Sequence, residues 1–183
     1  MSFAKDFEFV AGFADAFFRQ SRIRRSIEAF HKLGITKWES WLQVEMGLFF
    51  ETCPQIAEWD MEVPFALDQR QAISRGRQRK HVDLTVRQKG CARERWILLE
   101  LKQHNEMGRC VSSMLEDAQR IFAMRNRSHH GDQQRSFMNL GVFEAGSRPE
   151  IETHIRNAYE GADIAVDRLW VRKVTSRHHA VIV

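Results

Sequence analysis

The first part of the chain repeats apolar residues with the period of an amphipathic helix. Apolar side chains recur every three or four positions over residues 3–32, which predicts one or two helices there. Gly34 is the expected helix end, and a second helical pattern follows until Pro54 stops it. Thr36, three residues before Glu39, resembles a capping box for this second helix.

After this region, apolar residues recur at every second position instead of at the helical spacing of three or four. Residues 58–65 alternate apolar and polar side chains, which predicts a half-buried strand. Pro64 cannot donate a ladder hydrogen bond, so this strand is expected at a sheet edge or a bulge. Two more strands are predicted at 81–86 and 95–102, joined by a turn that contains Gly90.

The rest of the chain alternates helical and strand patterns. The predicted elements are a helix at 107–125, a strand at 137–143, a helix from Pro149 to about Tyr159, and short strands at 169–174 and 180–183. This order predicts an α/β (α+β) fold in which helices flank a mixed β-sheet. We expect one domain over residues 1–183, because this length suits one core and is short for two.

Composition and charge narrow the classes of protein. Apolar residues make up 43% and charged residues 28%, which is typical of a globular domain. The net charge of +4 permits a nucleic-acid partner without requiring one. The three cysteines form no CxxC pair, which argues against a disulfide framework or a structural zinc site. No stretch approaches the roughly 20 apolar residues of a membrane span, so we expect a soluble, cytoplasmic protein.

The apolar stretch WILLELKQ, residues 96–103, ends in groups that can do chemistry. In a symmetric hairpin, cross-strand partners have residue numbers that sum to 183, which places Asp83 opposite Glu100. Two carboxylates so placed repel each other, and a divalent cation would offset the repulsion. With the carbonyl of Leu101 they form an oxygen-rich site suited to Mg²⁺, or to Mn²⁺ as a substitute. Strand parity puts Lys102 on the face of Glu100, where an ammonium can orient water or stabilise charge on a phosphate.

A third carboxylate is expected from the helix that precedes these strands. Position 45 falls on the apolar stripe predicted for this helix, and a charge there is costly unless it is paired or bound to metal. Glu45 is therefore a candidate metal ligand or water-positioning base. If the helix is slightly rotated, Glu45 lies on the surface instead. Glu62 is the alternative third acid.

These residues together resemble the PD-(D/E)xK nuclease superfamily. Asp83 precedes Glu100-Leu101-Lys102 by seventeen positions, a helix comes before it, and the helical segment EDAQRIF follows. The resemblance covers a core of about residues 38–145. It implies a restriction-endonuclease-like αβββαβ core, here with an N-terminal helical extension, and metal-dependent hydrolysis of phosphodiester bonds. One departure is Val82, where the family pattern has proline.

The resemblance also implies roles for the candidate residues. Asp83 and Glu100 would ligate the metal, Lys102 would serve catalysis, and Glu45 would be the additional acid and metal ligand. The expected cofactor is Mg²⁺. The expected substrate is DNA, with RNA as the alternative. A homodimer would allow so small a nuclease to cut both strands of a duplex.

A basic segment leads directly into the strand of Asp83. Its positive residues are Arg75, Arg77, Arg79 and Lys80. Beside an anionic metal site, such a segment can neutralise phosphates and bind nucleic acid, whereas ordinary solvated charge is the alternative. Arginines between residues 19 and 25 extend this basic character.

Two other hypotheses remain beside a nuclease. One is a catalytically inert module of the same fold that binds nucleic acid or a protein partner. The other is an α/β protein in which Glu100 and Lys102 form only a strand-end ion pair. Clustered acids favour the nuclease, because an inert scaffold has no physical need for them.

Overall fold

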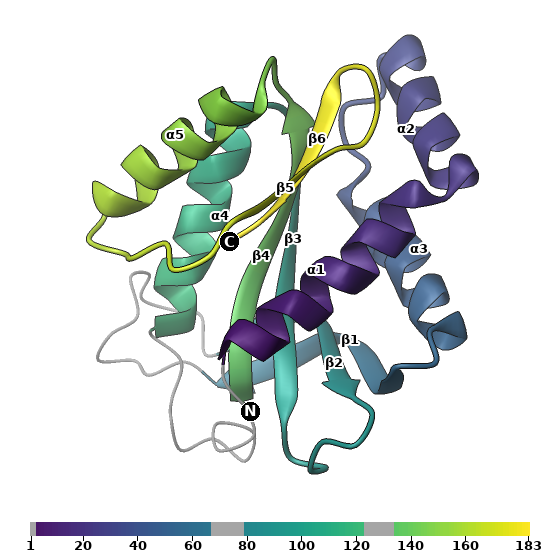
Figure 1. Ribbon diagram of the computed structural model, residues 1–183, viewed down its shortest axis with the longest axis vertical. Coiled ribbons are helices and arrows are strands. Elements are labelled where there is room, and N and C mark those ends of the chain that lie inside the picture. Colours follow the sequence, from purple (N-terminus) through teal and green to yellow (C-terminus); the bar gives the residue numbers. More distant parts are fainter. Residues whose placement is uncertain (1–2, 67–78, 123–133) are drawn as a thin grey trace.

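The computed structural model describes residues 3–66, 79–122 and 134–183. Within these residues the chain forms five helices and six strands (Figure 1). The helices are α1 (Phe3–Arg19), α2 (Ser21–Leu33), α3 (Glu39–Thr52), α4 (Met107–Phe122) and α5 (Arg148–Glu160). The strands are β1 (Ile56–Ala66), β2 (Arg79–Gln88), β3 (Trp96–Glu106), β4 (Gln134–Glu144), β5 (Trp170–Lys173) and β6 (His178–Ile182).

The strands form one mixed sheet in the order β1-β2-β3-β4-β6-β5. The neighbours β3 and β4 run parallel, and the other neighbouring pairs are antiparallel. From α3 to β4 the element order is αβββαβ, with α1 and α2 as an N-terminal extension. The predicted α+β class and the predicted edge position of β1 are confirmed. No helix in the described ranges is long and apolar enough to cross a membrane.

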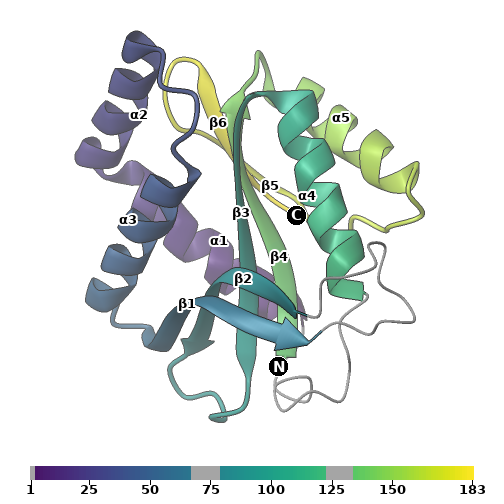
Figure 2. The same cartoon turned by 180° about the vertical axis from the view of Figure 1, so that it is seen from behind.

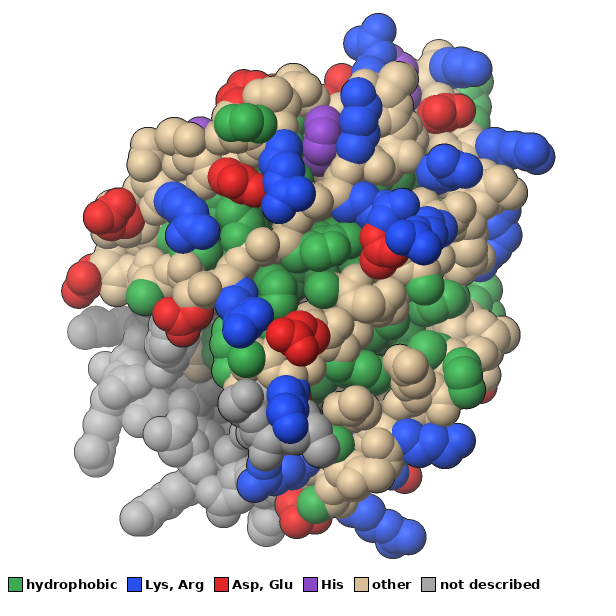
Figure 3. All heavy atoms as spheres, viewed as in Figure 1, with side chains coloured by type: hydrophobic (Ala, Val, Ile, Leu, Met, Phe, Trp, Pro, Cys, Tyr) green, Lys and Arg blue, Asp and Glu red, His purple; other side chains and the backbone are tan. Residues whose placement is uncertain are grey.

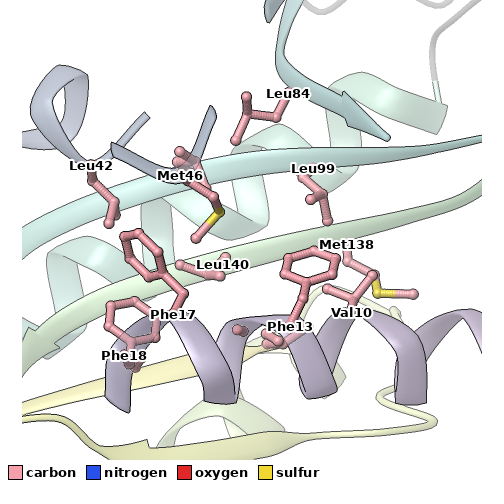
Figure 4. Packing of buried hydrophobic residues seen from close by; sticks show 14 of the residues in the cluster. Val10, Phe13, Phe17, Phe18, Leu42, Met46, Leu84, Leu99, Met138 and Leu140 are labelled. Atoms are coloured by element: carbon pink, nitrogen blue, oxygen red, sulfur yellow. The ribbon is translucent and has the colours of Figure 1, made fainter. Parts of the chain in front are cut away.

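Helices cover both faces of the sheet (Figures 1 and 2). The larger apolar cluster joins α1, α2 and α3 to one face, and a second cluster joins α4 and α5 to the other. Figure 4 shows the first cluster, in which Phe13 and Phe17 of α1 face Leu140 of β4. Burying each aromatic side chain contributes about 1.5–3 kcal/mol, so this packing holds the helical extension on the sheet.

The connection from α2 to α3 differs from the sequence prediction at one point. Gly34 ends α2 in the left-handed conformation (φ 68°), as predicted. The capping box from Thr36 is wrong, because Trp38 is the N-cap residue of α3 and makes no side-chain cap bond. Glu39 is instead the first residue of α3, and its carboxylate accepts a hydrogen bond from the backbone N–H of Gln103 in β3.

The rotation of α3 also differs from the prediction. Leu42, Met46 and Phe50 are fully buried, whereas the Glu45 side chain is 18% exposed and forms an ion pair with Arg22 of α2. Position 45 therefore flanks the buried stripe instead of lying at its centre, and its charge is paired with an arginine. Apolar residues occur on every side of α3, so the sequence period did not determine which side would face the sheet.

Helix α4 docks closely on β3 and β4. A Cβ atom added at Gly141 of β4 would lie 2.5 Å from Met114 Sδ and 3.3 Å from Cys110 Sγ. The Cys110 thiol also donates to the carbonyl of Lys102 (3.6 Å). Residues 110, 114 and 117 lie on one side of the helix, so this contact also sets the position of Asp117.

We expect Gly141→Ala to lower the free energy of unfolding by about 1–3 kcal/mol, because its methyl group would overlap the fully buried Met114 side chain. Urea denaturation measures this change. Gly12→Ala is the matched control, since nothing lies within 4 Å of its added Cβ. An unchanged stability for Gly141→Ala would show that α4 is not packed as described.

Candidate functional site

The candidate site forms where β2 and β3 part. The recorded pairs of the β2–β3 ladder are Leu84–Leu99, Thr85–Leu98 and Val86–Ile97, each summing to 183, which confirms the predicted register. Beyond Leu99, β3 continues along β4 as far as Glu106, whereas the recorded pairing with β2 has ended. Figure 2 shows β3 continuing upward between α3 and α4, past the β1–β2 hairpin.

On this edge of β3, side-chain carboxylates accept hydrogen bonds from the backbone N–H groups. Leu101 N donates to Asp83 Oδ2 at 2.7 Å, and Gln103 N donates to Glu39 Oε2 at 3.0 Å. The two donors are two residues apart, so they point to the same side of the strand. Two acidic side chains thus satisfy donors that a neighbouring strand would otherwise bind, which anchors both acids at the site.

The ammonium of Lys102 lies among four carboxylates. Its Nζ is 2.9 Å from Asp117 Oδ2, 3.7 Å from Glu39 Oε1, and 3.9 Å from both Asp83 Oδ2 and Glu100 Oε2. The acids come from α4, α3, β2 and β3, so segments far apart in sequence converge on one cation. Arg120 adds a second positive charge, 3.2 Å from Asp117 Oδ1, but the four acids still outnumber the cations beside them.

Burial makes this excess of acid costly. Glu100 and Asp117 have side chains only 3% and 4% exposed. Burial raises the pKa of Asp83 and of Glu39 above their ordinary values, although the charge of Lys102 opposes both shifts. Burial alone would lower the pKa of Lys102, but the neighbouring carboxylates, chiefly Asp117 and Glu39, raise it well above its ordinary value. Lys102 therefore stays protonated at neutral pH.

Three of the predicted site residues meet here, and the fourth does not. Asp83, Glu100 and Lys102 lie together, but Glu45 pairs with Arg22 of α2. Glu62, the alternative acid, lies at the rim. Its side chain is 57% exposed and accepts a hydrogen bond from Gln43, which also donates to the Asp83 carbonyl.

Two residues of the site were not predicted from the sequence. Glu39 was assigned to a capping box, although an acid in the first turn of a helix can equally reach a neighbouring strand. Asp117 lies three residues after Met114, on the sheet-facing stripe of α4. A charge at such a position is costly unless it has a partner, and that signal could have identified Asp117.

The donor set of the site suits a hard divalent cation. Among the described residues, no group of three or more His, Cys, Asp or Glu side chains is arranged to hold a metal ion. Asp83 and Glu100 nevertheless offer carboxylate oxygens beside the Leu101 carbonyl, which accepts from Lys102 Nζ at 2.8 Å. Mg²⁺ commonly binds through one or two carboxylates and keeps several water ligands, so two acids and a carbonyl are sufficient.

The predicted basic segment cannot be placed at the site. Arg75 and Arg77 lie outside the described residues, and Arg79 and Lys80 begin β2 with side chains that also lie outside the description. Helix α2 does carry exposed basic residues, and Figure 3 shows Lys and Arg side chains gathered over it. These are Arg22, Arg24, Arg25 and Lys32.

We expect Asp83→Asn to raise the free energy of unfolding at pH 7 by about 1 kcal/mol in the presence of EDTA, because it removes one of the excess buried charges. The pKa of Asp83 in the folded protein lies above its unfolded value of 3.8. The contribution of Asp83 to the free energy of unfolding is therefore fully present below pH 3.8 and is lost as the pH rises through the folded pKa. The advantage of Asp83→Asn should therefore vanish near pH 3.5. Glu116→Gln, at an exposed position, serves as the control; an equal gain for both variants contradicts the expectation.

Comparison with known proteins adds no family to this geometry: no protein-family model, no curated protein and no solved structure matches the chain. The chemistry available to the site therefore follows from its own residues.

Proposed function

We propose that the protein is a Mg²⁺-dependent nuclease that hydrolyses phosphodiester bonds, with DNA as its substrate. The observation that carries the proposal is the Lys102 ammonium within 3.9 Å of both Asp83 and Glu100. An acid pair with an adjacent cationic donor is suited to phosphate chemistry, in which a cation and hydrogen-bond donors must stabilise negative charge.

The fold supports the same proposal. The three residues lie on the second and third strands of an αβββαβ unit, where β2 and β3 separate. This is the arrangement expected for the PD-(D/E)xK superfamily, and we propose that the domain has its restriction-endonuclease-like fold. Where the strand pair opens, acidic side chains border β3 in place of a paired strand, while the rest of the sheet stays packed.

Asp83 and Glu100, together with the Leu101 carbonyl, would hold the cation. When bound, Mg²⁺ neutralises phosphate charge and lowers the pKa of a coordinated water. The two acids are prepared for this role by the fold: Glu100 is nearly inaccessible, and Asp83 is anchored by the N–H of Leu101. Side chains so restricted lose little freedom on binding an ion.

Lys102 acts as a hydrogen-bond donor rather than as a base. Its raised pKa keeps the proton on Nζ at neutral pH, so it can orient the attacking water and stabilise charge on a non-bridging phosphate oxygen. Water adds to phosphorus, the bond from phosphorus to one ester oxygen breaks, and the departing oxygen takes up a proton.

Glu39 is the additional acid of this mechanism, in place of Glu45. Its carboxylate lies 3.7 Å from Lys102 Nζ and is 42% exposed, so water and substrate can reach it. Burial raises the pKa of Glu39, which makes its carboxylate a better proton acceptor for the attacking water than an ordinary glutamate.

Binding of DNA would use positive charge outside the acidic cluster. The exposed basic residues of α2 can contact phosphates without reading sequence, as can the basic segment that precedes Asp83. A second copy of the chain would supply a second site for the other strand of a duplex.

We expect the wild-type chain to degrade plasmid DNA with Mg²⁺ and to lose activity in EDTA. Glu100→Gln and Lys102→Met should each lower the rate by about 100-fold or more, because the first removes a ligand of the cation and the second removes the donor that stabilises negative charge in the transition state. Glu116→Gln, an exposed residue of α4, should keep wild-type activity. Full activity in Glu100→Gln would refute the proposal.

The same assay separates the nuclease from an inert nucleic-acid-binding module. Calorimetric titration with Mn²⁺ and a DNA-binding measurement complete the comparison. DNA binding without Mn²⁺ binding or cleavage would favour the module. If the chain binds neither DNA nor Mn²⁺, Glu100 and Lys102 are part of a structural ion-pair network only.

We expect Glu39→Gln to lower the cleavage rate by about 10- to 100-fold, whereas Glu45→Gln changes it less than about twofold. The reason is that Glu39 contacts Lys102 and Glu45 pairs with Arg22. Initial rates on a fluorescent duplex provide the measurement. The opposite order of effects would restore Glu45 as the additional acid.

A further inference from the structure

Lys102 is not held equally by its four carboxylates. Asp117 Oδ2 lies 2.9 Å from Nζ, a close ion-pair contact, whereas the nearest oxygens of Asp83 and Glu100 each lie 3.9 Å from it. The nearest other acceptor is the Leu101 carbonyl at 2.8 Å. The ammonium is therefore displaced toward α4, away from the two proposed cation ligands.

We propose that Asp117 is a positioning residue that holds Lys102 on the α4 side of the site and so keeps Asp83 and Glu100 available to a divalent cation. The inference rests on the proposed function. A cation that takes the Leu101 carbonyl removes one of the two close acceptors of the ammonium. Asp117 remains as the other, so the buried ammonium never lacks a partner.

The surroundings of Asp117 suit this role. Its side chain is only 4% exposed, and the helix that carries it is fixed on β4 by the close contact of Met114 with Gly141. Its second oxygen, Oδ1, accepts from Arg120 Nη1 at 3.2 Å. Both carboxylate oxygens are thus engaged, which orients Oδ2 toward Lys102.

Loss of Asp117 would change which acids hold the ammonium. The remaining carboxylates are Glu39 at 3.7 Å and the cation ligands Asp83 and Glu100 at 3.9 Å. An ammonium that moves toward Asp83 and Glu100 competes with a divalent cation for their carboxylate oxygens. If Asp117 acts through Lys102, Asp117→Asn should weaken cation binding only when Lys102 is present. If Asp117 acts only through its general electrostatic effect, Asp117→Asn should weaken cation binding equally with or without Lys102.

Mn²⁺ titration of four proteins tests this dependence: wild type, Asp117→Asn, Lys102→Met and the double variant. We expect Asp117→Asn to weaken Mn²⁺ binding about tenfold when Lys102 is present and less than about twofold when it is Met. Glu160→Gln, which removes an exposed negative charge at the end of α5, should bind like the wild type. Equal losses in both backgrounds, or no loss in either, overturn the inference.

Unfolding in EDTA tests the same contact without any metal. A double-mutant cycle should give a coupling of about tenfold in the unfolding equilibrium constant between Asp117 and Lys102, well above the coupling between Asp83 and Lys102. Asp117→Glu, which keeps the charge, should retain most Mn²⁺ affinity if Asp117→Asn is too unstable to titrate. Equal couplings overturn the inference, whereas a wild-type chain that binds no Mn²⁺ overturns the proposed function instead.

Discussion

The site depends on an imbalance of charge: one ammonium, that of Lys102, lies among four carboxylates in a largely buried setting. A protein selected only for stability has no reason to gather Asp83, Glu100 and Asp117 around one cation, because each added acid must lose hydration. Burial accordingly raises the pKa of Asp83, against the lowering effect of the Leu101 N–H and of Lys102. Such an arrangement is typical of sites where an added cation or substrate completes the balance of charge.

The sheet makes this imbalance possible because, within the described residues, the β2-facing edge of β3 has no recorded strand partner beyond Leu99. Parallel pairing with β4 keeps the strand in place as far as Glu106, while the recorded pairs with β2 stop at Leu99. Carboxylates occupy the freed edge and accept the N–H groups of Leu101 and Gln103. Backbone hydrogen bonding and site chemistry are therefore satisfied by the same side chains.

Helix packing then determines which acids reach Lys102. The docking of α4 on Gly141 brings Asp117 to the ammonium, and the placement of Glu39 at the start of α3 brings a second acid from the opposite face of the sheet. The two helices are separated by the whole β1–β3 region in the sequence, yet they lie on either side of β3 (Figure 2). The acids from the strands alone would not enclose the ammonium.

The sequence by itself determined the elements, the register of the β2–β3 hairpin, and the meeting of Asp83, Glu100 and Lys102, because strand alternation and a symmetric turn are local rules. It did not determine the rotation of α3, whose apolar residues occur on all sides, so Glu45 was expected where Glu39 is found. Only the tertiary structure brought Asp117 to Lys102. Helix α4 follows β3 directly, so this contact depends on how the helix folds back against the strand, which no sequence period records.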